Sequence, residues 1–231
     1  MGKIVVIEGT DFSGKTTQYE KLKERLAAEG YFIGTDSFPN YDSESSYFVR
    51  AYLGGKFSET AEEIHPKVAS LFYGLDRYAS YKTKEWGKIY DNGGNILFAR
   101  YISSNILHQA SKYHTQEEKV EFIKWLYDTE VGMLGIPKED KVILLDMPPE
   151  WGQKLKVKRL EEQGGLSSSG GVKDIHELDT EHLLHAYETA MSVAEILDWK
   201  VVHCVENNRL KSIEEIHKEI YDLTISIFHS K

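Results

Sequence analysis

The chain has 231 residues, which suffices for one large or two small domains with a sizeable core. Its formal net charge of −9 excludes the broad basic surface of nonspecific nucleic-acid-binding proteins, and its 41 % hydrophobic content excludes wholesale disorder. No apolar run approaches the ~20 residues of a membrane span, and Glu8 comes too early for a signal peptide. The single cysteine, Cys204, excludes an internal disulfide. We therefore expect a cytoplasmic protein without nucleic-acid or membrane partners.

Short β-rich runs alternate with longer helical stretches along the chain. Ile4–Ile7 is a continuous β-branched run, which is typical of a strand covered on both faces. Gly30 marks the end of a first helix, Pro39 a loop, and Pro66 the first turn of another helix. In chain order we expect a strand at 4–8, a helix at 15–29, a strand at 31–36, helices at 44–53 and 66–86, a strand at 95–99, helices at 103–113 and 116–131, a strand at 141–146, helices at 150–162 and 175–197, a strand at 199–204 and a helix at 211–229.

This alternation predicts an α/β fold, with a five-stranded parallel sheet and helices on both of its faces. No linker is long enough to divide the chain, so we expect a single domain over 1–231.

One segment differs from the rest by composition, because seven of the eight residues at 164–171 are glycine or serine. Such a segment forms either a flexible surface connection or a mobile lid. Basic residues crowd its N-terminal flank, at Lys154, Lys156, Lys158 and Arg159, and they favour a lid over about 152–174.

The first predicted strand leads into a phosphate-binding motif. Residues 9–16 read Gly-Thr-Asp-Phe-Ser-Gly-Lys-Thr and match G-x-x-x-x-G-K-[ST] between a strand and a helix. Glycines let the backbone wrap phosphates, and the helix N-terminus adds partial positive charge. The pattern predicts binding of a nucleoside triphosphate with Mg²⁺, with Lys15 on the β/γ-phosphates and Thr16 on the metal. The expected phosphate-binding residues are Gly9, Thr10, Asp11, Phe12, Ser13, Gly14, Lys15, Thr16 and Thr17.

The motif alone does not identify the phosphate acceptor. No Asn-Lys-x-Asp guanine-reading motif is present, and the chain is short for a motor ATPase. A small phosphate-loop domain with a glycine-rich lid favours a nucleotide or nucleoside kinase, which must close over its substrates to keep water from the phosphate.

Several segments together resemble thymidylate kinases. They are the loop 8–18, Phe-Pro-Asn-Tyr at 38–41, Leu-Phe-Tyr-Gly-Leu-Asp-Arg-Tyr at 71–78, Arg-Tyr-Ile-Ser-Ser-Asn at 100–105 with Gln109, and 145–150 with 174–177. The resemblance implies a phosphate-loop kinase fold, transfer of phosphate from ATP with Mg²⁺ to dTMP, and a homodimer.

The resemblance also implies roles for single residues. Tyr73 would stack on the thymine ring, Arg100 would bind the acceptor phosphate, and Asp11 would reach the 3′-hydroxyl. Arg77 would contact the base or the phosphate. From the residues alone, Tyr73 could equally be a core aromatic, and the arginines could be surface charges. The other expected pocket residues are Phe38, Pro39, Arg50, Ser104, Asn105 and Gln109.

Two positions depart from the family pattern. Ala99 stands where the resemblance leads us to expect an aspartate near the transferring phosphate, and Phe12 stands where some members carry arginine. Lys158 and Arg159 would then supply the catalytic cations from the lid, beside Lys15 and Arg100. The missing aspartate keeps two alternatives open, a nucleotide-binding homologue with impaired catalysis and a deoxynucleoside kinase with Glu8 as base.

Overall fold

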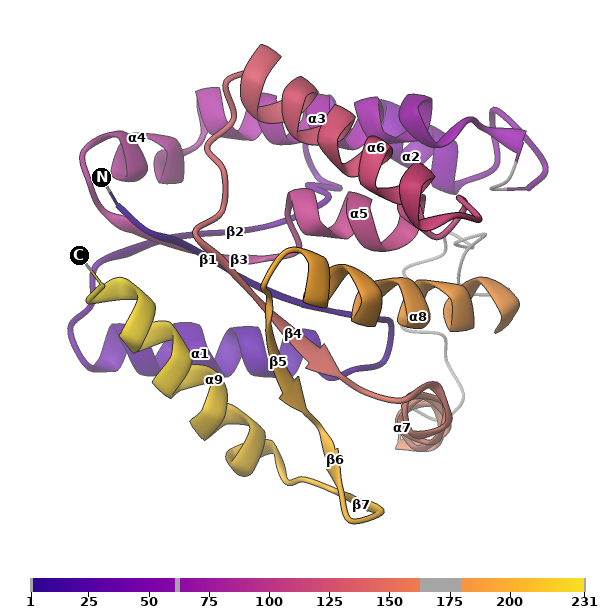
Figure 1. Cartoon of the computed structure of the whole chain (residues 1–231). Helices are drawn as coiled ribbons and strands as arrows, with labels where there is room; N and C mark the ends of the chain where they lie inside the picture. Colours follow the sequence, from indigo (N-terminus) through magenta and orange to yellow (C-terminus); the bar gives the residue numbers. More distant parts are fainter. Residues whose placement is uncertain (1, 61–62, 163–179, 231) are drawn as a thin grey trace.

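The computed structural model describes residues 2–60, 63–162 and 180–230, with side chains at all of these positions except 159–162 and 180–183. Five parallel strands form the central sheet in the order β2-β3-β1-β4-β5 (Figure 1). The expected parallel sheet is therefore confirmed. The strands are β1 (Ile4–Gly9), β2 (Ile33–Ser37), β3 (Asn95–Ala99), β4 (Lys141–Asp146) and β5 (Lys200–His203).

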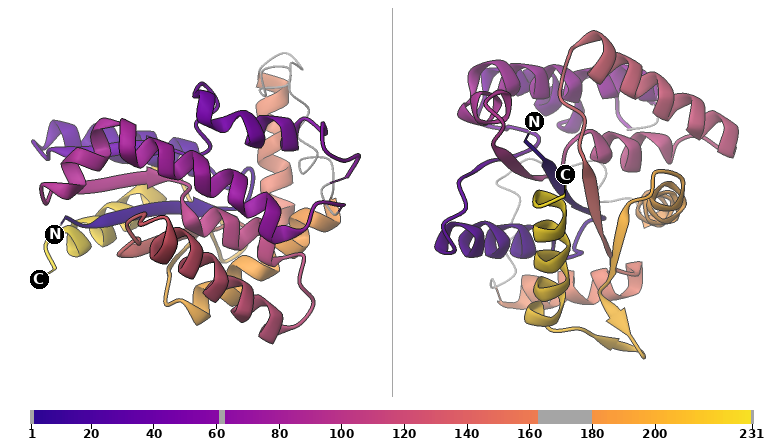
Figure 2. Two further views of the ribbon diagram at one scale, coloured as in Figure 1. Left: turned by 90° about the horizontal axis from the view of Figure 1, so that it is seen from above. Right: turned by 60° about the vertical axis from the view of Figure 1, so that its left-hand side comes forward.

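Helices cover both faces of the sheet, as the sequence predicts (Figures 1 and 2). Successive side chains of a strand point to opposite faces, so Val5 and Ile7 pack toward α1 (Lys15–Ala28) and α9 (Ile213–Phe228). Ile4 and Val6 pack in a second core on the other face. The helices that contribute to this second core are α4 (Glu85–Asp91), α5 (Ile102–Ala110), α6 (Gln116–Tyr127) and α8 (Thr180–Ile196).

Three further helices surround the carboxyl ends of the strands. They are α2 (Tyr47–Leu53), preceded by a 3₁₀ turn at Glu44–Ser46, α3 (Pro66–Thr83) and α7 (Pro149–Glu162). Of the expected lid, residues 152–162 belong to α7, whereas 163–174 and the glycine-rich segment within them lie outside the described residues. No helix of the described ranges is long and apolar enough to cross a membrane.

The prediction of one helix over 66–86 is wrong, because Lys84 adopts an extended conformation between α3 and α4. This break lets Trp86 turn into the core, where its ring meets Phe98 at 4.8 Å and its Nε1 donates to Ser80 Oγ at 2.8 Å. The free energy gained by burying this tryptophan with its N–H hydrogen-bonded exceeds the free energy lost by interrupting the helix.

Two other elements differ from expectation. The helix predicted at 116–131 changes after Tyr127 into a π-helical turn, η3 (Asp128–Met133). The strand predicted to end at 204 continues into a small hairpin, β6 (Val205–Glu206) and β7 (Arg209–Leu210). Asn207 and Asn208 form its turn with φ of 51° and 57°, a conformation that asparagine tolerates well. Cys204, between β5 and the hairpin, is fully buried, and burial raises the pKa of its thiol to about 12.

A buried acid lies between η3 and β4. Glu139 is 7 % exposed, and its Oε1 accepts from the Tyr127 hydroxyl at 2.5 Å. No described residue hydrogen-bonds its Oε2. Burial raises the pKa of Glu139 from 4.5 to about 7, so the folded protein holds this carboxyl protonated at pH values where the unfolded chain has lost the proton.

We therefore predict that the free energy of unfolding decreases as pH rises from about 4.5 to about 7, because the native state binds the extra proton over this range. Glu139→Gln, which stays neutral and can still accept from Tyr127, should remove this decrease and stabilise the protein above pH 7 by about 3 kcal/mol. Urea unfolding at pH 5 and pH 8 measures the effect, with the exposed Glu117→Gln as a control that matches the change in charge. An unchanged pH dependence in Glu139→Gln would contradict this assignment.

Candidate active site

The loop between β1 and α1 has the geometry of a phosphate cradle. Phe12 and Gly14 adopt left-handed backbone conformations, with φ of 61° and 83°. Lys15 is buried in the loop, and its ammonium donates to the Gly9 carbonyl at 2.6 Å. Burial and, second, the positive charge of Arg100 lower the pKa of Lys15 to about 8, so the amine is mostly charged at neutral pH.

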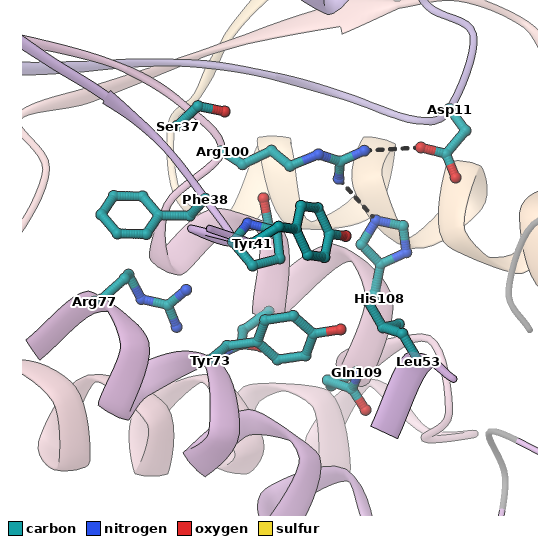
Figure 3. A pocket seen from close by; sticks show the side chains of 13 residues that line it. Asp11, Ser37, Phe38, Tyr41, Leu53, Tyr73, Arg77, Arg100, His108 and Gln109 are labelled. Carbon is teal, nitrogen blue, oxygen red and sulfur yellow. Dashed lines mark hydrogen bonds and ion pairs between the residues drawn. The ribbon is translucent and has the colours of Figure 1, made fainter. Parts of the chain in front are cut away.

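An ion pair joins this loop to the end of β3. Nη2 of Arg100 donates to Oδ1 of Asp11 at 2.8 Å, and its Nη1 lies 3.3 Å from Nε2 of His108 (Figure 3). Burial opposes the charged carboxylate, but the attraction of Arg100, followed by that of Lys15, outweighs it and holds the pKa of Asp11 well below its usual range. Arg100 itself has a φ of 63°, which turns the chain sharply between β3 and α5.

A cavity of about 320 Å³ opens beside this ion pair, at the small end of the range for ligand pockets. It is bounded by the ends of β1, β2 and β3 and by α2, α3 and α5 (Figure 3). Nine predicted residues line it, namely Asp11, Phe38, Pro39, Tyr73, Arg77, Arg100, Ser104, Asn105 and Gln109. Four residues that sequence reasoning missed also line it: Ser37, Tyr41, Leu53 and His108.

His108 could have been found from helical spacing. It follows Ser104 by four residues, so the two side chains share one face of α5. A histidine among other expected pocket residues on a helix face is a signal of a functional role, although its proximity to Arg100 depends on the fold.

Arg50 is the one predicted pocket residue that does not line the cavity. Its Nη1 donates to the carbonyls of Tyr41 and Ser43 at 2.5 and 2.8 Å, and also to the hydroxyl of Ser46. The guanidinium satisfies the carbonyls of the loop that carries Tyr41 into the cavity. Arg50 therefore holds a wall of the pocket in place.

The floor of the cavity contains a buried ion pair. Arg77 and Glu130 are each 1 % exposed, and they pair through Nε–Oε2 at 2.7 Å and Nη2–Oε1 at 2.5 Å. Asn105 Nδ2 donates to the same Oε1 at 3.0 Å. Among the described residues none accepts from Nη1 of Arg77, and none bonds the buried amide oxygen of Gln109. The floor thus offers a ligand the charged N–H donors on Nη1 of Arg77 and one neutral acceptor on Gln109.

Glu8 is fully buried beneath the loop, and hydrogen bonds occupy both of its oxygens. Oε2 accepts from the hydroxyls of Ser103 and Ser104 at 2.9 and 2.6 Å, and Oε1 accepts from the Gly9 amide at 3.1 Å. These bonds tie α5 to β1 and leave Glu8 poorly placed to take a proton from a sugar hydroxyl.

The other residues that the sequence analysis singled out differ in their exposure. Ala99 is 6 % exposed and packs in the core on the α1 face, with Ile7 and Leu97. Lys158 is exposed on α7, and Arg159 lies outside the residues with described side chains. Thr16 is exposed in the first turn of α1.

The described residues contain no cluster of three or more acidic, histidine or cysteine side chains that could hold a metal. A single hydroxyl at the mouth of a phosphate loop fits Mg²⁺ that is bound mainly through nucleotide phosphates and water, which is the coordination that Mg²⁺ prefers.

The Arg77–Glu130 pair generates a prediction. Glu130→Ala should destabilise the fold by about 3–5 kcal/mol, because it leaves the Arg77 charge buried without a partner. The double replacement Arg77→Met with Glu130→Leu should recover most of this loss. Thermal or urea unfolding measures both variants, with the exposed Glu121→Ala of α6 as a control. Equal losses in Glu130→Ala and Glu121→Ala would show that the pair carries no buried charge.

Comparisons with known proteins identify the family of the chain. A family model described as thymidylate kinase matches residues 7–220. The thymidylate kinase of Mycobacterium tuberculosis H37Rv is 28 % identical over 180 residues, covering 77 % of this chain and 79 % of that protein. The human thymidylate kinase is 24 % identical over 219 residues, covering 95 % of this chain and 88 % of that protein.

Among solved structures, the thymidylate kinase of Candida albicans superimposes with a TM-score of 0.64 at 19 % identity, over 97 % of this chain and 92 % of that one. This likeness shows the shared fold alone. Because the family match spans most of the chain and includes the phosphate loop, α3 and α5, the chain belongs to the thymidylate kinase family of enzymes.

Proposed function

We propose that this enzyme transfers the γ-phosphoryl group of ATP to dTMP and releases dTDP and ADP. The observation that carries the proposal is the Asp11–Arg100 ion pair, because it joins the phosphate loop directly to the neighbouring cavity. A donor in the loop and an acceptor in the cavity would have their phosphates adjacent across one guanidinium. Such an arrangement suits direct transfer between two bound nucleotides.

The donor side rests on the loop of residues 9–17. Its backbone amides, Lys15 and the N-terminus of α1 would hold the β- and γ-phosphates of ATP. In the described state the Lys15 ammonium bonds to the Gly9 carbonyl, and it would exchange that partner for phosphate oxygens. Mg²⁺ held by Thr16 and the phosphates would neutralise charge on the transferring group.

The chemistry of the cavity favours a thymine-like base on the acceptor. Tyr73 offers an aromatic face to a flat ring. The free donor of Arg77 and the unpaired acceptor of Gln109 complement a base that shows a carbonyl beside an N–H. A base that presents an amino group beside a bare ring nitrogen matches this pair less well.

The acceptor phosphate would bind Arg100, whose Nη2 already donates a hydrogen bond to Asp11. Catalysis would then consist of positioning and charge stabilisation by Lys15, Arg100 and the cations Lys158 and Arg159. Such a mechanism is compatible with alanine at position 99, because phosphoryl transfer between nucleotides needs no strong base there. We expect the enzyme to work in the cytoplasm without nucleic-acid or membrane partners.

A coupled assay of ADP release tests the proposal. With ATP and Mg²⁺ we expect turnover with dTMP, much weaker turnover with dCMP, and none with thymidine. Lys15→Ala should reduce kcat by at least about 100-fold, because it removes a charge that stabilises the transition state. Preference for thymidine would identify a deoxynucleoside kinase. Binding of both nucleotides without turnover would identify a homologue that has lost catalysis.

We also propose that the enzyme is a homodimer, as the family resemblance implies. Four exposed apolar residues recur at helical spacing along α3, namely Val68, Leu71, Leu75 and Tyr78. A stripe of this kind marks a contact surface.

Sedimentation should therefore give twice the mass of the chain. The pair of substitutions Leu71→Glu and Leu75→Glu should give a folded monomer, because it places charge in the contact. Thr83→Glu at the end of α3 is the control. A monomeric wild-type protein would exclude the dimer.

A further inference from the structure

Two of the lysines on α7 lie over aromatic rings. The Lys154 ammonium lies 4.1 Å from the ring centroid of Trp151, its neighbour on the same helix. The Lys156 ammonium lies 4.8 Å from the ring centroid of Phe12, which belongs to the phosphate loop. Of these two contacts, only that of Lys156 brings a positive charge from α7 to the loop. Lys156 is not among the cations that the sequence singled out as catalytic.

The backbone of α7 is packed directly against the loop. Gly152 is buried, and a Cβ placed on it would lie 3.5 Å from the Asp11 carbonyl oxygen and 3.8 Å from Phe12 Cβ. Trp151 and Leu155 anchor the same part of the helix on the core of the α1 face. Lys156 follows Gly152 by four residues, so it projects from the face of α7 that meets the loop. Packing of the helix therefore fixes the position from which Lys156 reaches Phe12.

Phe12 occupies an unfavourable backbone conformation for its size. Its φ of 61° lies in the left-handed region, which bulky residues rarely adopt. Strain of this kind collects at functional sites, where the surrounding structure enforces it. Here the loop turn presents the ring toward α7, and the negative face of the ring attracts the ammonium.

We propose that Phe12 holds the Lys156 ammonium at the phosphate loop, where it binds the phosphate chain of a nucleoside triphosphate together with Lys15. An ammonium that rests on an aromatic ring keeps N–H donors free on its other side, and phosphate oxygens are strong acceptors for them. Phe12, although neutral, thereby places the positive charge of Lys156 at the phosphate loop. The inference rests on the proposed function only in taking a nucleoside triphosphate as the donor.

Loss of the Lys156 charge should lower the affinity for one nucleotide more than for another. A nonhydrolysable ATP analogue with Mg²⁺ has a γ-phosphate that ADP lacks, so a cation at the loop should favour the analogue. We expect Lys156→Met to weaken binding of the analogue about tenfold and binding of ADP by less than about threefold, the scale of one charge-assisted hydrogen bond. Lys156→Arg should retain most of the affinity. Lys154→Met is the control, because it removes the same charge from α7 at a position that contacts Trp151 instead of the loop. This variant should bind both nucleotides like wild type.

A double-mutant cycle tests the role of the ring. Phe12→Leu should weaken analogue binding, Phe12→Tyr should preserve it, and Phe12→Leu combined with Lys156→Met should be no weaker than Lys156→Met alone, because both changes remove one interaction. Calorimetric titration supplies the affinities, and the melting temperature of each variant shows that it folds. Additive losses in the cycle, or equal affinities of wild type and Lys156→Met, would overturn the proposal.

The titrations contain no phosphate acceptor, so an error in the acceptor assignment does not affect them. If the wild-type protein binds the analogue and the Lys156 variants bind it equally well, the inference about Lys156 fails and the proposed function stands. If the wild-type protein binds neither nucleotide, both fail.

Discussion

The arrangement of the site depends on the ion pair between Asp11 and Arg100. Asp11 belongs to the loop after β1, and Arg100 directly follows β3, the strand beside β1 in the sheet. Each charge is partly buried, and each would be costly to keep without the other. The pair therefore fixes the distance between the phosphate loop and the cavity. His108 lies beside Arg100, and the charge of Lys15 acts on both Asp11 and Arg100, so a change in the charge of one group affects the others.

A second, fully buried ion pair forms the floor of the same cavity. Glu130 lies in the π-helical turn that follows α6. Its carboxylate orients Arg77 and accepts a hydrogen bond from Asn105. Turns of this kind often occur at functional sites, because the extra residue re-aims a side chain that a regular helix would point elsewhere. Residues of α3, α5 and this π-helical turn thus build the cavity floor, and the pair holds Nη1 of Arg77, which no described residue occupies, in a fixed direction.

The sequence predicts well those features that depend on neighbours along the chain. The five strands and the loop at 9–17 follow from apolar runs, glycines and motif spacing, whereas most cavity residues were expected only through the resemblance to thymidylate kinases. The break at Lys84 could not be predicted, because its cause is Trp86 packing on Phe98 of another element. Glu130 was missed for the same reason, since its importance lies in its contact with Arg77. Helical spacing places His108 among the expected pocket residues, but its contact with Arg100 also depends on the fold. Arg50, expected in the pocket, instead donates to carbonyls of a loop whose conformation no local pattern specifies.

The burial of Cys204 has a practical consequence for labelling this enzyme with spectroscopic probes. The chain has one cysteine, and its thiol is fully buried with a pKa raised to about 12. Thiol reagents attack the exposed thiolate, so Cys204 is nearly inert to them. A cysteine introduced on the exposed side of α7, for example at Gln153, would therefore be the sole site to take a fluorophore or spin label. The natural chain is a ready background for spectroscopic tests of whether α7 moves when nucleotides bind.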